Sequence, residues 1–306
     1  MSAEGGTKAV VAALFANLGI AVTKFVAYGL TMSSSMLAEA IHSVADSGNQ
    51  VLLLVGGKRA SREATPQHPF GYGRQRYIYA FIVSIVLFTV GGLFALYESY
   101  HKLQHPEPIT AWKWVPVTVL VVAIVLEGLS FRTAIKESRG PKGKASWAEF
   151  VRRARVPELP VILLEDFAAL VGLVLALFGV GMTLITGDGI WDAIGTGMIG
   201  LLLVAVAVIL AVEMNSLLIG ESATEENEAR IVTAITGGGE VDRIIHMKTL
   251  HLGPEELLVA AKVGIRHDST AAEIAQGINA IEVRIREAVP IARVIYIEPD
   301  IYSTER

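Results

Sequence analysis

The chain has 306 residues, of which 52% are hydrophobic and only 18% are charged, and its mean hydropathy is +0.51. A water-soluble protein of this length carries more charge, so the composition indicates a protein with several membrane-spanning segments. The net charge is −4 and the sequence has no basic tail that would bind nucleic acid. The absence of cysteine excludes disulfides, thiolate metal sites and thiol catalysis.

Six apolar segments are long enough to cross roughly 30 Å of hydrocarbon as helices. They are predicted at residues 8–30, 35–57, 77–99, 111–134, 160–186 and 190–218. Basic residues are concentrated in the connections 58–76 and 132–155, whereas 31–34 and 187–189 contain no Lys or Arg. The positive-inside rule then places both basic loops and both termini in the cytoplasm. Residues 1–218 are therefore predicted to form an α-helical polytopic transmembrane domain.

Small and charged residues inside these spans predict how the helices pack. Lys24 is expected to snorkel or to pair with a carboxylate such as Glu39. Asp188 and Asp192 are expected to cap the sixth helix, because a helix N-terminus favours acidic groups. Pairs of glycines are expected to let neighbouring helices approach closely. These pairs are Gly56-Gly57, Gly91-Gly92 and Gly195-x-Gly197.

The composition changes after Ser216, and residues 219–306 predict a second, water-exposed domain. Its predicted elements are a helix at 221–236, strands at 241–252 and 257–265, a helix at 270–287 and a strand at 291–297. The order αββαβ predicts a small ferredoxin-like α+β domain with its helices on one face of the sheet. At about 80 residues such a domain buries little surface, which favours pairing with a second copy.

The second predicted span carries two ionisable residues, His42 and Asp46. A spacing of four residues places both side chains on one face of a helix, about one turn apart. Ionisable groups at bilayer depth cost several kcal/mol and rarely face lipid. Since imidazole and carboxylate both coordinate divalent metal ions, the pair predicts a metal site inside the membrane.

The chain resembles the cation diffusion facilitators, the solute carrier 30 type of zinc transporter. The residues that carry this resemblance are Ser34–Gln50, His68–Tyr77, Leu163–Ala169 and the closing Tyr296–Asp300. The resemblance implies six helices with both termini inside and a cytosolic αββαβ domain. It also implies a homodimer that alternates between inward- and outward-facing states and exports or sequesters divalent cations in exchange for protons.

The resemblance further implies a transport site made of one pair of ligands on the second helix and one on the fifth. His42 and Asp46 match the first pair, and Asp166 matches one member of the second. The position four residues before Asp166 is Ile162, where many members have histidine, and Glu165 is expected to take the missing ligand's place. The predicted metal ligands are thus His42, Asp46, Asp166 and Glu165. With one nitrogen ligand, such a site discriminates Zn²⁺ less well from Mn²⁺, Fe²⁺ or Co²⁺.

Two accessory metal sites of the family lack their ligands in this sequence. The 58–76 loop keeps His68 but has Thr65 and Tyr72 at neighbouring positions, and the final strand has Ile297-Glu298-Pro299 where histidine and aspartate are expected. The second domain is therefore expected to serve dimerisation rather than metal binding.

Together these features predict a proton-coupled divalent-cation antiporter, zinc first, in the cytoplasmic membrane of a bacterium or archaeon. Its partners would be the metal ion, protons, the lipid bilayer and a second copy of the chain, with the metal as substrate and no cofactor. Imidazole and carboxylate bind either a proton or a metal ion, which provides the coupling. The alternatives are a manganese, iron or cobalt exporter on the same scaffold and a non-transporting metal sensor. An intramembrane enzyme is disfavoured, since no span contains His-Glu-x-x-His or a nucleophile motif.

Overall fold

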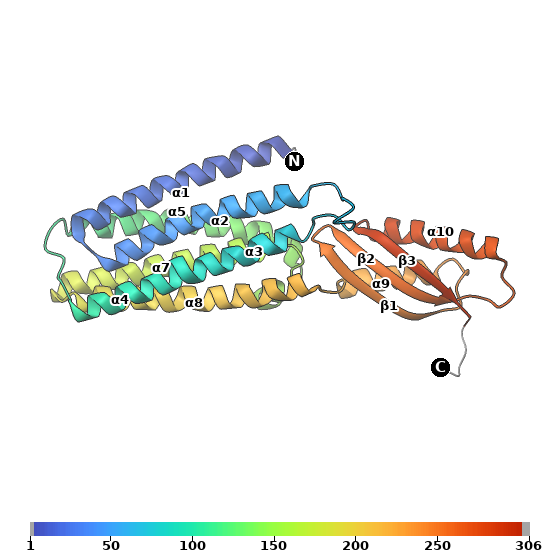
Figure 1. Cartoon of the computed structure of the whole chain (residues 1–306). Helices are drawn as coiled ribbons and strands as arrows, with labels where there is room; N and C mark the ends of the chain where they lie inside the picture. Colours follow the sequence, from blue (N-terminus) through green and yellow to red (C-terminus); the bar gives the residue numbers. More distant parts are fainter. Residues whose placement is uncertain (1–2, 302–306) are drawn as a thin grey trace. The chain divides into compact units, whose positions relative to one another are not determined.

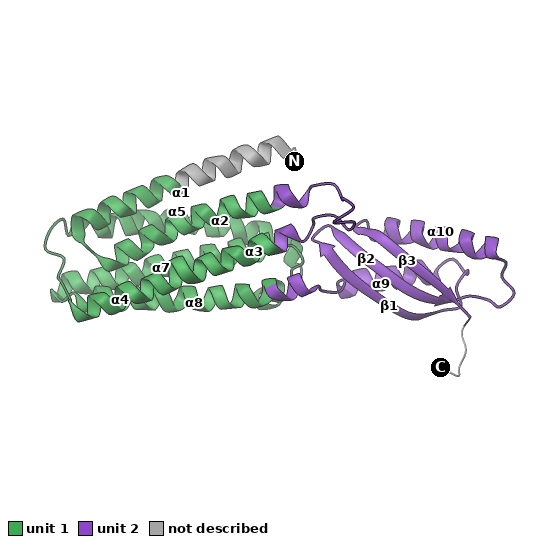
Figure 2. Ribbon diagram, in the orientation of Figure 1, with its two compact units in different colours: residues 1–56, 78–214 green, residues 57–77, 215–306 purple. Residues whose placement is uncertain are grey.

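A computed structural model describes residues 3–301 of the chain, with side chains from residue 17 onward. The chain divides into two compact units, one made of residues 1–56 and 78–214 and the other of residues 57–77 and 215–306 (Figure 2). The sequence analysis assigned the basic loop 58–76 to the membrane domain, whereas in the structure it packs within the second unit.

The first unit is built from long helices whose positions follow the six predicted spans (Figure 1). In the described residues these are α1 (Ala3–Thr31), α2 (Ser34–Ala60), the continuous run α3 (Gln75–Val86), η1 (Leu87–Leu93) and α4 (Phe94–Gln104), then α5 (Trp114–Lys142), α7 (Glu158–Thr186) and α8 (Ile190–Ile219). By length and composition, four of the described helical segments can cross a membrane: Gln75–Gln104, α5, α7 and α8. The prediction of six spans is thus supported for four of them.

Polar residues set α2 apart from these four helices. Its buried positions include Glu39, His42, Asp46 and Asn49. Burial of charged and amide groups in a helix of this length requires partners from neighbouring helices, so α2 depends on the rest of the bundle for its place.

Glycines bring α8 close to two of its neighbours, as the glycine pairs predicted. A Cβ added at Gly92, within the π-helical stretch η1, would lie 2.7 Å from Val204 Cγ2 on α8. A Cβ added at Gly195 of α8 would lie 3.0 Å from Gly179 Cα on α7. Side chains at these positions would push the backbones apart, so the glycines set the helix spacing.

The start of α2 is held by an aspartate from another helix. Asp192 Oδ2 accepts hydrogen bonds from the Ser34 amide at 2.7 Å and the Ser34 hydroxyl at 3.1 Å, and Asp192 Oδ1 accepts from the Ser33 hydroxyl at 2.9 Å. Asp192 lies in the first turn of α8, but it caps α2. Asp188 does cap α8, accepting from the Ile190 amide at 3.0 Å. The capping prediction was therefore right for Asp188 and wrong for Asp192, because folding brings the free amides of α2 nearer to that carboxylate.

The basic connection after α5 contains a short helix that the sequence analysis treated as loop, α6 (Trp147–Arg153). Gly143, with a φ of 54°, ends α5, and the Ser146 side chain accepts a hydrogen bond from the Glu149 amide to begin α6. Phe150 of α6 packs in a cluster with Ala134 and Leu163, which joins this helix to α5 and α7.

The second unit has the predicted order αββαβ. Its elements are α9 (Glu225–Thr236), β1 (Arg243–Gly253), β2 (Glu256–Gly264), α10 (Ala271–Ala288) and β3 (Ala292–Asp300). The sheet order is β1-β2-β3, with β1 antiparallel and β3 parallel to β2. The parallel pair needs a crossover, which α10 provides.

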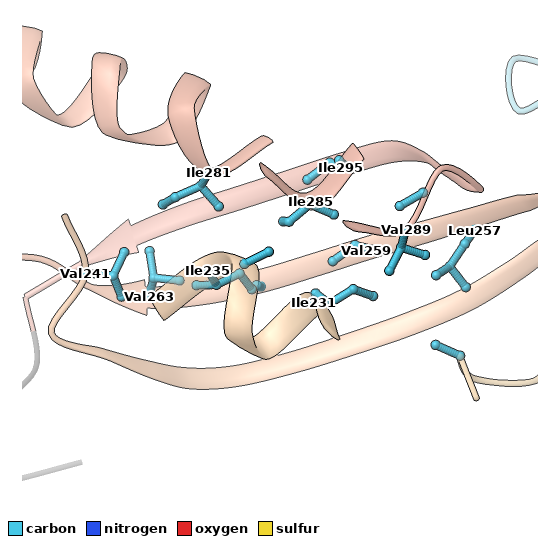
Figure 3. Close-up of a cluster of buried hydrophobic side chains, with 14 residues drawn as sticks. Ile231, Ile235, Val241, Leu257, Val259, Val263, Ile281, Ile285, Val289 and Ile295 are labelled. Carbon is cyan, nitrogen blue, oxygen red and sulfur yellow. The ribbon is translucent and has the colours of Figure 1, made fainter. Parts of the chain in front are cut away.

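One face of this sheet carries the core of the second unit. Leu257, Val259, Ala261 and Val263 alternate along β2 and are buried, as the period of two in a strand requires. Isoleucines of α9 and α10 point toward them from the two helices (Figure 3). Both helices therefore cover the same face, as predicted.

Candidate metal site

His42 and Asp46 lie one turn apart in the first half of α2. His42 Nδ1 is 3.5 Å from Asp46 Oδ1, and the His42 side chain is 1% exposed. Within the described residues, both ring nitrogens of His42 and Asp46 Oδ1 are buried without a hydrogen-bond partner. Buried polar atoms normally have partners because leaving them unsatisfied costs about 1–3 kcal/mol each. The predicted pair therefore lies on one helix face, and three of its nitrogen and oxygen atoms are available to bind a ligand.

Glu165 of α7 reaches the same turn of α2. Its carboxyl group contacts that of Asp46, and its Oε1 accepts a hydrogen bond from Asn49 Nδ2 at 2.8 Å. Glu165 is 6% exposed and Asn49 is fully buried. The amide of Asn49 thus holds the carboxylate of Glu165 against Asp46.

Asp166 takes a different direction from its neighbour in the sequence. Its Oδ2 accepts a hydrogen bond from the Ser130 hydroxyl of α5 at 2.9 Å, and its side chain is half-buried. Successive residues of a helix differ by about 100° in direction, so the two side chains meet different neighbouring helices. In this structure Glu165 faces Asp46 and Asp166 faces α5.

Charged groups surround this turn of α2. Lys24 Nζ of α1 pairs with Glu39 Oε2 at 3.0 Å and donates to Ser43 Oγ at 2.7 Å, which confirms the predicted pairing. A narrow space lined by Ser43, Asp46 and the half-buried Glu127 lies between α1, α2 and α5. Around this turn the carboxyl groups of Glu39, Asp46 and Glu127 outnumber the one ammonium group of Lys24, and such an excess of acid favours a cation.

A close backbone approach completes the surroundings of His42. A Cβ added at Gly91 in η1 would lie 3.8 Å from His42 Nδ1, so the π-helical stretch passes directly beside the imidazole. Stretches of π-helix inside α-helices are frequent at functional sites. The sequence analysis assigned the Gly91-Gly92 pair to helix packing alone and did not place it beside His42.

The four predicted ligands are not gathered into one cluster. In the described residues, no group of three or more His, Asp or Glu side chains is placed to hold a metal ion. His42 lies beside Asp46, Asp46 contacts Glu165, and Asp166 is turned toward Ser130. The four-ligand site therefore stays a prediction. Asn49 was missed as a partner of Glu165, although its position seven residues after His42 marked the same helix face.

Long apolar helices that bury imidazole, carboxyl and ammonium groups among themselves are typical of a multi-pass membrane protein. Comparison with known proteins supports this class. Residues 10–219 match the family model described as the cation efflux transmembrane domain, which is more than half of the chain and describes a transporter rather than an enzyme. The chain belongs to the cation efflux family, the cation diffusion facilitators of the solute carrier 30 type.

Curated relatives extend the similarity beyond that domain. The chain is 33% identical over 265 residues to the mitochondrial proton-coupled zinc antiporter SLC30A9 of Xenopus laevis, covering 86% of this chain and 47% of that protein. The human protein of the same name is 33% identical over 262 residues, covering 85% and 46%. Metal tolerance protein C4 of Arabidopsis thaliana is 27% identical over 260 residues, covering 84% and 56%. The chain spans about half the length of the curated relatives it matches.

The comparison corrects one prediction. We placed the protein in the cytoplasmic membrane of a bacterium or archaeon, but the similar antiporters from Xenopus and human are named mitochondrial. The predicted location is therefore wrong, and the comparison supports only the coarser statement of a multi-pass membrane protein. The error arose because the positive-inside rule orders the two sides of a membrane without identifying which membrane it is.

Proposed function

We propose that the chain moves divalent metal cations, zinc first, across a membrane in exchange for protons. The unit would be a homodimer of six-span subunits that alternates between facing the two sides. The single observation that carries this proposal is the turn of α2 with His42 and Asp46, where three buried ligand-type atoms have no hydrogen-bond partner within the described residues. Membership in the cation efflux family and similarity to proteins named proton-coupled zinc antiporters support it.

Proton exchange follows from the chemistry of the ligands. An imidazole or carboxylate that binds a metal ion must release its proton, so one site holds either protons or metal. Antiport results if both loaded forms change their facing and the empty form does so poorly. The excess of carboxyl groups disfavours the empty, fully ionised form, because like charges in a low-dielectric interior repel strongly.

We propose His42, Asp46, Glu165 and Asp166 as the metal ligands, and the geometry ranks them. The first three form a chain of contacts between α2 and α7, and Asp166 requires a small rotation of α7 or release from Ser130 to join them. Because carboxylate oxygens outnumber imidazole nitrogens, manganese, iron or cobalt is the alternative substrate.

The test is flux into proteoliposomes loaded with a metal-sensitive dye, with Zn²⁺, Mn²⁺, Fe²⁺ and Co²⁺ in turn. Asp46→Ala and Glu165→Ala are expected to lower metal flux by roughly 100-fold or more, since losing even a supporting partner costs 10–100-fold. His42→Ala should lower the flux likewise. His101→Ala, which changes an exposed imidazole near the end of α4, is its matched control and should retain full flux. Equal flux in wild type and Asp46→Ala would reject the proposed site.

A pH-sensitive dye in the same vesicles tests the coupling. Addition of metal outside should move protons out of the vesicles in proportion to metal entry. Metal uptake with no pH change would reject antiport while leaving transport intact.

The second candidate function is a metal sensor that does not transport. It draws on the second unit, whose separate core would let it respond to metal on its own. Removal of residues 221–306 distinguishes the two functions, because retained metal tolerance in cells supports transport by the helical unit and its complete loss favours sensing.

A further inference from the structure

An apolar pocket of about 630 Å³ lies between α5, α6, α7 and α8, and none of the proposed metal ligands lines it. Eleven of its thirteen lining residues are apolar, among them Phe131, Trp147 and Phe167, and the two exceptions are Arg152 and Glu213. The volume falls within the range of roughly 300–1,000 Å³ that small-molecule sites occupy. The pocket is therefore large enough for a flexible hydrocarbon chain.

The pocket lies toward the start of α7 and is lined by a residue of the basic connection 132–155. Because an α-helix rises 1.5 Å per residue, Leu163 and Phe167 lie about 8 Å and about 14 Å from the first residue of α7. The remaining wall includes α6, a seven-residue helix that carries both Trp147 and Arg152. Tryptophan with arginine is the pairing that membrane-interface helices use, with the ring in the apolar layer and the charge in the headgroups.

Charge identifies the polar end of the ligand. Arg152 lies in the connection 132–155, which contains eight Lys and Arg residues. A guanidinium binds a phosphate through two parallel hydrogen bonds, and a basic segment near a membrane attracts anionic headgroups. A second copy of the chain would cover apolar side chains equally well, but the exposed Arg152 beside them favours an occupant that carries a phosphate.

We propose that this pocket binds one acyl chain of an anionic phospholipid, with the lipid phosphate at Arg152. Glu213 lines the same pocket and opposes this binding, because its carboxylate repels the phosphate and offers Arg152 an internal counter-charge. The lipid fills the space between α7 and α8 next to Leu164 and Phe167, which flank Glu165 and Asp166 in the sequence. It would thereby fix the position of α7. Binding of the lipid does not depend on transport activity.

The experiment measures fluorescence quenching of the full chain in detergent by phospholipids with brominated acyl chains. Trp147 lines the pocket, while the other tryptophans, Trp112, Trp114 and Trp191, lie outside it and report unspecific contact. Brominated phosphatidylglycerol is expected to quench saturably and to bind roughly tenfold tighter than brominated phosphatidylcholine, the effect of one charge-assisted contact. Trp147→Phe should remove the saturable part of the signal.

Two pairs of variants separate a site from general attraction. Arg152→Gln should abolish the preference for phosphatidylglycerol, whereas Arg153→Gln, a neighbour outside the pocket lining, should keep it. Glu213→Gln should strengthen the preference, and Ala148→Trp should fill the pocket and remove saturable quenching by both lipids. Melting curves and size-exclusion profiles check that each variant is folded.

Three results would overturn the proposal. Equal affinity of the wild type for the two lipids would exclude recognition of the phosphate. An equal loss in Arg152→Gln and Arg153→Gln would assign the attraction to the whole basic connection. Dissociation of a dimer by Ala148→Trp would show that a second copy of the chain occupies the pocket.

Discussion

The buried ion pair between Lys24 and Glu39 offers the sharpest test of the bundle. The two charged atoms are 3.0 Å apart, and the side chains are 1% and 0% exposed. Removing one partner of a buried pair leaves an uncompensated charge and costs about 3–5 kcal/mol, while replacing both partners is often neutral. Glu39→Gln keeps the shape of the side chain and removes the carboxylate charge with which Lys24 pairs.

Thermal unfolding of the purified chain in detergent measures this cost. A shift of roughly 2–4 °C per kcal/mol converts the cost into a fall of about 6–20 °C in the Tm of Glu39→Gln. The double variant Lys24→Met with Glu39→Gln should recover most of that fall. Glu149→Gln is the matched control, because it breaks an exposed ion pair with Arg153. The Arg153 and Glu149 side chains are 64% and 40% exposed, so this variant should lower stability by less than about 1 kcal/mol.

Two results would refute this reasoning. A fall below about 2 °C in Glu39→Gln would mean that water or another group solvates Lys24, so that the charge is not held in a low-dielectric interior. A double variant no more stable than Glu39→Gln would mean that the loss comes from altered packing around residue 39. In either case the pair would not be what holds α1 against α2.

The remaining predictions concern a helix cap, a contact between two helices, and the loss of stability at acid pH. Asp192→Asn should lower stability by about 1–2 kcal/mol in the same melting assay, because a neutral amide replaces the charge at the start of α2, and an unchanged Tm would contradict the cap. Gly200→Ala should lower stability by roughly 1–3 kcal/mol, because the added Cβ would lie 2.8 Å from Leu96 Cγ on α4. Gly128→Ala is the control, since its added Cβ would meet nothing within 4 Å, and it should be neutral or slightly stabilising. Equal effects of the two variants would contradict the close contact. Hydrogen bonds from Arg284 lower the pKa of Glu240 from its ordinary value of 4.5, so this contribution is present above pH 4.5 and is lost as the pH falls through the lower, folded-state pKa. Glu240→Gln should therefore flatten the acid limb of the stability profile, and an unchanged limb would contradict it.

Much of this architecture could be predicted from local sequence patterns. Hydropathy located the long helices because each needs a run of apolar residues, and alternation located the strands of the second unit because their side chains alternate between two faces. The pairing of Lys24 with Glu39 was predictable as well, since a charge inside a span has few partners to choose from.

The direction of individual side chains between helices was not predictable. Glu165 and Asp166 are adjacent, and only the packing of α7 decides that the first faces α2 and the second faces α5. Asp192 is an equally good cap for its own helix or for another, and the fold selects α2. Contacts between distant segments decide both cases, and a single sequence does not contain them.

Helix α2 is the polar helix of the bundle, and its buried polar atoms without hydrogen-bond partners support the proposed transport. Among the described residues, six buried side-chain atoms of α2 lack a hydrogen-bond partner, and they belong to Glu39, His42, Asp46, Asn49 and Gln50. Their spacing of three, four, three and one places them along one helix face, over a length of about 16 Å. Natural sequences satisfy buried polar groups except where function requires otherwise. A cation crossing the bundle must exchange water for protein ligands step by step, and a row of free oxygen and nitrogen atoms along one helix provides those steps, whereas a single structural ion pair needs no such row.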